Sequence, residues 1–170
     1  GEDIEVHINS GGGDVYAGSE IYTALRAYSG KVVVKIVGIA ASAASVIAMA
    51  GDVVEISPTA QIMIHNVSSR VDGDHNTLLH EAGVLEGFNK SIANAYVDKT
   101  GKALDDLLDL MDKTTWFDAE SAVNQGFADR IMFAGEIAPT FAASETPMIP
   151  HDFIDKMKSA MTPDIDKIAE

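Results

Sequence analysis

The stretch VVVKIVGIAASAASVIAMA, residues 32–50, brings a serine to the point where a predicted strand gives way to a predicted helix. Val32 to Ile36 is β-branched and apolar apart from Lys35, which is typical of a central strand that is buried on both faces. Gly38 interrupts this pattern. From Ser42 onward the residues are small or apolar and carry no charge, which predicts an interior helix. The stretch therefore predicts a buried strand-to-helix junction at Ser42.

Ser42 allows two interpretations at this junction. A helix N-terminus offers unpaired backbone N–H groups and the positive end of the helix dipole, so a serine oxygen placed there is suited to nucleophilic attack beside groups that stabilise an oxyanion. Serine is also a leading N-cap residue, and the stretch alone is consistent with a purely structural cap.

The residues before this stretch predict a strand, a glycine-rich loop and a helix. Ile4 to Ile8 alternates as a strand does, Gly11 to Gly13 follows it, and Asp14 begins a helix to about Tyr28. A βαβ unit of this kind has a right-handed crossover and places the glycine loop and Ser42 at one edge of the sheet. The loop lacks the lysine of a P-loop and the spacing of a dinucleotide loop, which leaves an oxyanion-binding loop or a plain tight turn.

Two features follow the junction. A short strand, Ile62 to Ile64, ends at His65, the histidine with the most suggestive setting, although a single histidine is often only structural. The pattern from His75 to Lys99 is strongly helical and has a wide apolar face. Gly83 and Gly87 lie one turn apart on it, so the helix is predicted to serve either an interface between subunits or ordinary core packing.

The remaining chain completes one domain and a tail. We expect a helix with leucines from Leu104 to Met111, an extended piece at 111–117, a helix from Asp118 to Gln125 and a last strand from Phe127 to Phe133. The predicted domain covers residues 1–134, a linker covers 135–150, and a short amphipathic tail covers 151–170.

Composition restricts the class of protein. The chain has 170 residues, of which 46% are hydrophobic, as expected of one globular domain. Its 12 basic residues stand against 26 acidic ones, and the net charge of −14 argues against nucleic acid as a partner. The absence of cysteine excludes disulfides and thiolate chemistry. With no membrane-length apolar run, no metal-ligand spacing and no cofactor motif, we expect a cytoplasmic protein without membrane contact that needs no cofactor.

Four ordered motifs resemble the Clp protease proteolytic subunits, serine peptidases that share a spiral fold with the crotonases. The motifs are INSGGGDVYAG (8–18), GIAASAAS (38–45), MIHN (63–66) and WFDAESAVNQGFADRI (116–131). The resemblance covers roughly residues 4–133. It implies an α/β fold, a ClpP/crotonase-like spiral of βαβ units with a long handle helix, in which the N-terminal part of the family's domain is missing.

Carried over position by position, the resemblance implies a catalytic site. Ser42 is then the nucleophile and His65 the general base, while the backbone N–H groups of Gly13 and Ala43 form the oxyanion hole. A serine hydroxyl needs such a base because it is almost fully protonated at neutral pH.

The third catalytic member departs from the family. Counting back from Trp116, the position that holds an acid in the family is Thr114, and Asp112 lies two residues earlier. Threonine can accept the imidazole N–H but brings no negative charge, so the site is either a Ser–His dyad or uses Asp112 instead. Residues two apart in an extended chain face the same way, which keeps Asp112 a candidate.

The resemblance favours a serine endopeptidase, a hydrolase that forms a ring-shaped homo-oligomer through residues 75–99. The sequence of residues 40–52 and the tail are most similar to those of Clp-like peptidases from phage head gene clusters. This resemblance implies ATP-independent cleavage of capsid or scaffold proteins during head maturation. The alternatives are a housekeeping Clp-type protease working with an ATP-driven unfoldase, or a catalytically degenerate assembly protein with the ClpP/crotonase fold. A serine–lysine signal peptide peptidase fits less well because MIHN supplies a histidine.

Overall fold

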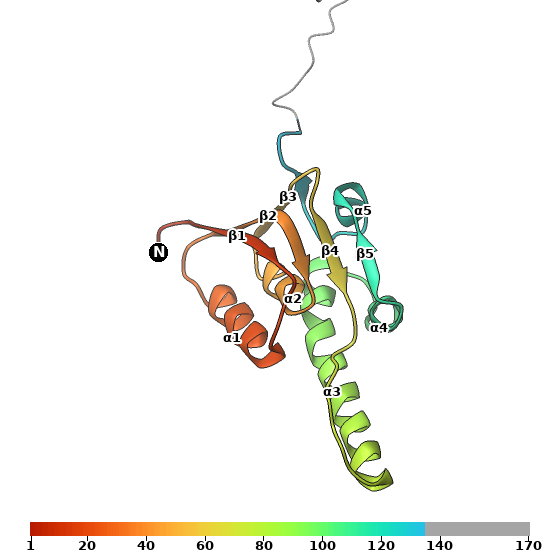
Figure 1. Ribbon diagram of the computed structural model, residues 1–170. Helices are drawn as coiled ribbons and strands as arrows, with labels where there is room; N and C mark the ends of the chain where they lie inside the picture. The colour runs from red at the N-terminus through yellow and green to blue at the C-terminus, as the bar shows by residue number, and fades with distance from the viewer. Residues whose placement is uncertain (135–170) are drawn as a thin grey trace, which may run out of the picture. The chain divides into compact units, whose positions relative to one another are not determined.

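Strand β2 lies at the centre of the six-stranded sheet in the computed structural model, which describes residues 1–134 (Figure 1). One edge of β2 pairs with β1, and its other edge pairs first with β3 and then, nearer its end, with β4, all in parallel. Strand β6 joins β3 in parallel and β5 joins β4 antiparallel. The strands are β1 (Ile4–Ser10), β2 (Val32–Ala41), β3 (Val53–Ile56), β4 (Gln61–Ile64), β5 (Thr115–Phe117) and β6 (Arg130–Ile131).

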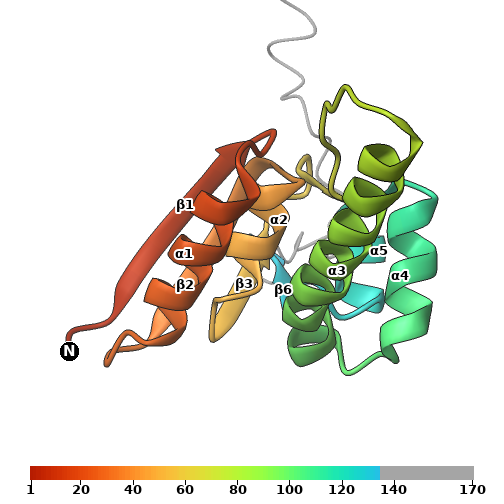
Figure 2. The same cartoon turned by 90° about the horizontal axis from the view of Figure 1, so that it is seen from below.

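The helices follow the strands in the order expected of a spiral of βαβ units. They are α1 (Val15–Arg26), α2 (Ala43–Ala48), α3 (His75–Thr100), α4 (Leu104–Asp112) and α5 (Ala119–Asn124). Helices α1 and α2 lie side by side on the same side of β1 and β2, and α3 and α4 form a second pair (Figure 2). The prediction of an α/β fold with a long helix is therefore confirmed.

Helix α3 illustrates how local sequence sets the boundaries of an element. Its 26 residues begin after Asp74, whose carboxylate accepts a hydrogen bond of 3.0 Å from the N–H of Thr77. This bond holds the pKa of Asp74 below its usual range. The helix ends at Gly101, which has a left-handed φ of 70°. No helix among residues 1–134 is long and apolar enough to cross a bilayer.

Strand β2 differs from its sequence prediction in two ways. It does not stop at Gly38 but continues to Ala41, because β1 bulges between Ile8 and Ser10 and the missing side chain of Gly38 leaves room for Asn9. A Cβ at Gly38 would lie 2.4 Å from Asn9 Oδ1. The bulge thus lets the strand carry the chain all the way to Ser42.

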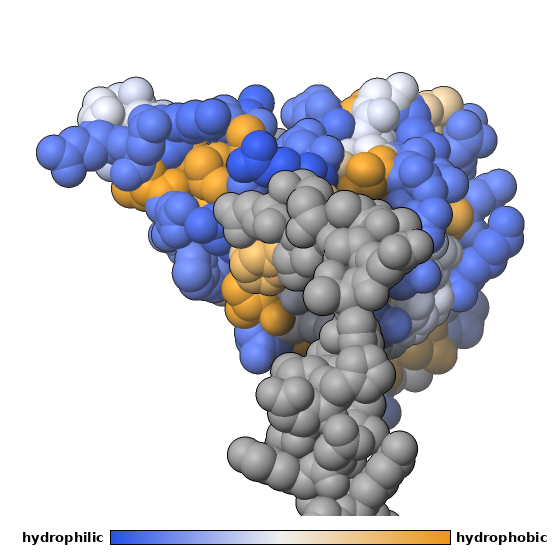
Figure 3. Space-filling model, turned by 90° about the horizontal axis from the view of Figure 1, so that it is seen from above, coloured by the Kyte–Doolittle hydropathy of each residue, from blue (hydrophilic) through white to orange (hydrophobic). Residues whose placement is uncertain are grey.

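Over residues 32–37 the strand is also buried on one face only. Val34 and Ile36 are fully buried, whereas Lys35 on the opposite face is half-buried, with its Nζ 2.6 Å from Glu5 Oε1 on β1. This hydrogen bond holds the pKa of the Glu5 carboxyl below its usual range. Along the same row of the sheet, Arg130 on β6 pairs with the buried Glu55 on β3. Figure 3 shows the molecule from above. Hydrophilic residues cover much of the described surface on this face, and separate apolar patches lie between them.

Three predicted boundaries near the ends of elements are wrong. Helix α1 stops at Arg26 and not at Tyr28, because the Tyr28 hydroxyl donates to the carbonyl of Glu2 and the chain turns back toward the sheet. Asp112 belongs to helix α4 and not to an extended piece, since the helix continues to its cap at Lys113. The last strand is only β6, because Phe127 and the residue after it leave the turn at Gly126 to enter the core.

The predicted linker (135–150) and tail (151–170) lie outside the described residues.

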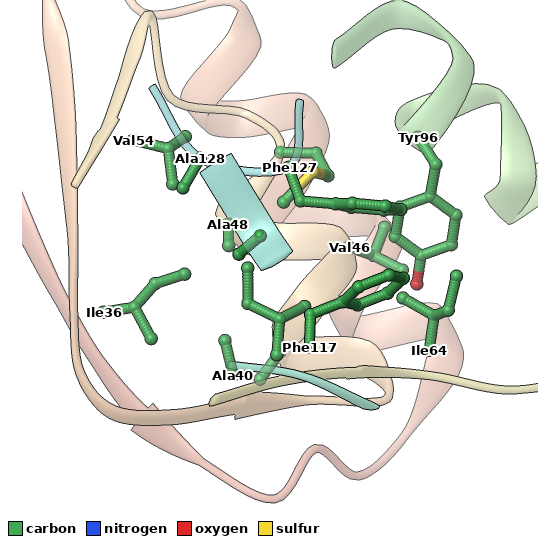
Figure 4. Packing of buried hydrophobic residues seen from close by; sticks show 14 of the residues in the cluster. Ile36, Ala40, Val46, Ala48, Val54, Ile64, Tyr96, Phe117, Phe127 and Ala128 are labelled. Carbon is green, nitrogen blue, oxygen red and sulfur yellow. The ribbon is translucent and has the colours of Figure 1, made fainter. Parts of the chain in front are cut away.

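The core is closed by aromatic rings from elements that are distant in the sequence. Phe127 packs against Phe117 of β5, with ring centroids 4.6 Å apart, and against Tyr96 of α3, at 5.8 Å (Figure 4). Offset and edge-on aromatic pairs of this kind add to the free energy gained by burial. The cluster joins α3 to the strand pair β4 and β5.

We expect Ile36→Ala to lower the free energy of unfolding by about 2–5 kcal/mol, because it opens a cavity in the fully buried face of β2. The adjacent Val37 is 40% exposed on the other face, so Val37→Ala is the matched control and should cost less than about 1 kcal/mol. Denaturant titration of both variants measures the difference, and equal losses would contradict the one-sided burial of β2.

Candidate active site

The backbone at Ser42 is strained. Ser42 connects the last residue of β2 to the first of α2 with φ 55° and ψ −129°, a region that residues other than glycine rarely occupy. Its N–H donates to the carbonyl of Met63 on β4 at 2.9 Å. Its side chain makes no capping hydrogen bond, so the N-cap interpretation does not describe this serine. A sharp, strained turn that exposes a serine Oγ between a strand and a helix is the geometry of a nucleophile elbow.

His65 reaches this serine from the neighbouring strand. It directly follows β4, whose Met63 pairs in register with Ala41 of β2, so the chain leaves both strands at the same edge. The His65 Nε2 atom lies 2.8 Å from Ser42 Oγ. The ring is half-buried, which keeps solvent from part of the pair. This distance is within the range required for a general base and its nucleophile.

The glycine loop lies beneath the serine. Gly12 has φ 96°, and a Cβ there would lie 2.6 Å from Ser42 Cβ and 2.7 Å from the carbonyl oxygen of Ala41. Only glycine allows so close an approach at this φ. No hydrogen bond between described residues uses the N–H of Gly13 or of Ala43, and both residues line the same pocket as Ser42. Two unpaired N–H groups beside a serine Oγ are suited to bind an oxyanion.

A pocket of about 340 Å³ opens over the Ser–His pair. Ser42, His65 and Gly13 form part of its wall, and apolar residues of α3, including Leu85 and Phe88, line it as well. Polar residues, among them Asp14 and Glu81, form the rest of the wall, and a volume of this order is typical of small-ligand and side-chain recognition. The pocket can therefore take an apolar group of a substrate beside the reactive oxygen.

Neither candidate for the third catalytic member is hydrogen-bonded to His65 among the described residues. Its only ring hydrogen bond to another residue of the described chain is that to Ser42. Thr114 has a left-handed φ of 51° and its N–H donates to Met111. Asp112 lies at the end of α4, so the expectation that Asp112 and Thr114 face the same way along an extended chain is wrong.

Asn66, the residue after His65, is the hydrogen-bond partner of the Asp112 carboxylate, and the sequence analysis did not single it out. Its Nδ2 donates to Asp112 Oδ1 at 2.5 Å, while its Oδ1 is buried without a partner among the described residues. The sequence signal that could have pointed to Asn66 is its position directly after His65. Within residues 1–134, no group of three or more His, Asp or Glu side chains is arranged to hold a metal ion.

A strand-to-helix serine paired with a histidine, beside free backbone N–H groups, is the arrangement of a serine hydrolase. The Clp protease family matches residues 1–135. The chain is 34% identical over 128 residues to an ATP-dependent Clp protease proteolytic subunit of Pleurastrum terricola, covering 74% of this chain and 65% of that protein. It is 30% identical to proteolytic subunit 2 of Tropheryma whipplei (76% and 73% covered) and 31% identical to a proteolytic subunit of Bacteroides fragilis (78% and 65% covered).

The chain belongs to the Clp protease family, and it spans about two thirds of the length of these curated relatives.

We expect Gly12→Ala to disturb the site directly. The new Cβ meets Ser42 Cβ and the Ala41 carbonyl at an unfavourable φ, so the variant should lose about 1–3 kcal/mol of stability and react more slowly with a serine-directed fluorophosphonate. Gly83→Ala is the matched control, because Gly83 lies in helix α3 with nothing within 4 Å of its Cβ position. That variant should be as stable as the parent or slightly more so. Unchanged labelling of Gly12→Ala would contradict the close packing of the loop beneath Ser42.

Proposed function

We propose that this chain is a serine endopeptidase with Ser42 as nucleophile and His65 as general base. The observation that carries the proposal is the 2.8 Å distance between His65 Nε2 and Ser42 Oγ at a strained strand-to-helix turn. His65 removes the Ser42 proton as Oγ attacks the peptide carbonyl. The resulting oxyanion accepts hydrogen bonds from the N–H groups of Gly13 and Ala43. The protonated His65 then gives its proton to the leaving amine, and water activated by the same ring hydrolyses the acyl-enzyme.

We further propose that the site works as a Ser–His dyad. Thr114 stands where the family has an acid, and Asp112 is held by Asn66, so neither provides a carboxylate to the imidazole. Because His65 has no carboxylate partner among the described residues, a catalytically degenerate assembly protein is the second candidate function. A chain without peptidase chemistry would keep the fold and lose reactivity at Ser42, so serine-directed labelling separates the two.

Ser42→Ala and His65→Ala should each lower kcat by at least about 10⁴-fold in hydrolysis of an unfolded protein such as casein, because each removes a member of one proton-transfer unit. For a dyad, Asp112→Asn and Thr114→Val should change kcat by less than about tenfold. A loss of about 10³-fold or more in Asp112→Asn would instead identify Asp112 as the third member. Full activity in Ser42→Ala would refute the peptidase assignment.

For the substrate, the names of the relatives favour unfolded proteins delivered by an ATP-driven unfoldase. Those proteins are called proteolytic subunits of an ATP-dependent protease, which fits the housekeeping alternative better than the phage interpretation. Cleavage of capsid or scaffold proteins without ATP stays a prediction from the sequence resemblance, and a cytoplasmic location stays a prediction from the sequence. If the chain degrades a folded substrate only when an unfoldase and ATP are added, the housekeeping role is favoured over the phage role.

We also propose that α3 mediates assembly into a ring-shaped homo-oligomer. The first half of the helix extends away from the sheet (Figure 1), and Leu78 and Leu79 there are 48% and 70% exposed. Apolar side chains gathered on an extended helix gain free energy when a second copy covers them.

Leu79→Glu should shift the chain to smaller species in analytical ultracentrifugation, because it places a charge in the proposed interface. His80→Glu is the matched control, since it brings the same charge to the next exposed position without removing an apolar contact. An unchanged distribution in Leu79→Glu would place the interface elsewhere.

A further inference from the structure

A buried chain of hydrogen bonds connects α3 to the backbone of Ser42. The Tyr96 hydroxyl lies 2.8 Å from Ser45 Oγ, and Ser45 Oγ lies 2.6 Å from the carbonyl oxygen of Ser42. Ser45 is 0% exposed and Tyr96 is 1% exposed. Two hydroxyl groups in such surroundings are costly unless each has a partner, so the chain is a built feature of the core.

The direction of this chain is fixed by chemistry. A carbonyl oxygen can only accept, so the Ser45 hydroxyl donates to Ser42 and has no further proton to give. The Tyr96 hydroxyl must therefore donate to Ser45. Burial raises the pKa of the Tyr96 hydroxyl far above its usual range, which keeps this donor protonated.

The carbonyl that receives these bonds belongs to the peptide group whose N–H is that of Ala43. A trans peptide is planar, and its N–H points opposite to its C=O, so a fixed carbonyl aims the N–H. The Ser42 oxygen also accepts from the N–H of Ser45 at 2.9 Å and of Val46 at 3.4 Å. These backbone bonds and the Ser45 hydroxyl all come from the short helix α2 itself, whereas the Tyr96 hydroxyl that bonds to Ser45 comes from α3. The Ser45–Tyr96 hydrogen bond therefore ties this peptide to the rest of the core.

We propose that Ser45 and Tyr96 are positioning residues that aim and polarise the Ala43 N–H as an oxyanion donor. The inference rests on the proposed peptidase function and adds to it two residues whose hydroxyl groups act through the Ser42 carbonyl. Hydrogen bonds in series polarise one another, so donation to the Ser42 carbonyl makes the N–H at the other end of the peptide a stronger donor. The oxyanion hole then depends on a tyrosine hydroxyl 51 residues away in sequence from the serine it holds.

The aromatic cluster keeps Tyr96 in place. Its ring packs against Phe127, and Phe127 packs against Phe117 (Figure 4). Phe117 is the cross-strand partner of Ile62 on β4, the strand that leads to His65. The same cluster therefore supports both the oxyanion donor and the general base.

The test compares Ser45→Ala, Tyr96→Phe and the double variant in peptide hydrolysis and thermal unfolding. Ser45→Ala leaves the Tyr96 hydroxyl buried without its partner and should be the least stable. The double variant removes both hydroxyls and should regain most of that stability. If the pair positions the donor, kcat of the double variant stays about 10- to 100-fold below the parent with KM unchanged, because misaimed oxyanion donors act on the transition state only.

A purely structural role predicts the opposite outcome for the double variant, namely that kcat returns together with stability, and this result would overturn the inference. A second readout is the affinity of a peptide aldehyde, whose hemiacetal oxygen occupies the oxyanion position. The affinity of this aldehyde should weaken in proportion to kcat/KM across the three variants, while the pH dependence of kcat/KM stays unchanged.

Two matched controls remove hydroxyls elsewhere. Tyr28→Phe removes a hydroxyl bonded to the Glu2 carbonyl, and Ser91→Ala removes one bonded to the Gly87 carbonyl within α3. Both should keep the parent kcat. A parent chain with no Ser42-dependent activity would refute the proposed function and the inference together, whereas a Ser42-dependent parent with a fully active double variant would refute the inference alone.

Discussion

The hydrogen bond from the Ser42 N–H to the Met63 carbonyl is the contact on which the rest of the site depends. It joins the end of β2 to β4 at 2.9 Å, after β2 has already paired with β3 along its first half. Strand β4 pairs with β2 only near the end of β2. The residues that follow β4 therefore pass beside the strand-to-helix turn at Ser42. His65 then lies within hydrogen-bond distance of Ser42 without any loop having to bring it there.

The proposed catalytic pair of Ser42 and His65 has no carboxylate partner among the described residues. No carboxylate of the described chain is hydrogen-bonded to the imidazole, so an imidazolium formed during the reaction gains no direct ion pair. A larger share of transition-state stabilisation must then come from the backbone donors. This is the setting in which the rigidity of the Ser42–Ala43 peptide, supported by Ser45 and Tyr96, has most effect on the rate.

Sequence alone predicted the parts of the site that local patterns encode. Ser42, His65 and the glycine loop each lie at the end of a strand, and parallel strands bring such ends together. The extent of α4 was missed because the left-handed backbone at Thr114 has no sequence signal in a residue other than glycine. Ser45 was read as one more small helix residue, since its partner Tyr96 comes from a helix far along the chain and only packing reveals the contact.

The left-handed backbone of Ser42 has a consequence for how this protein evolves. A residue held in that region costs about 1–3 kcal/mol, a sizeable fraction of the stability of a small domain. Selection for stability alone would replace the serine with glycine, which adopts the same φ without strain. Placing a serine at this turn therefore trades part of the stability of the domain for the position of one hydroxyl group.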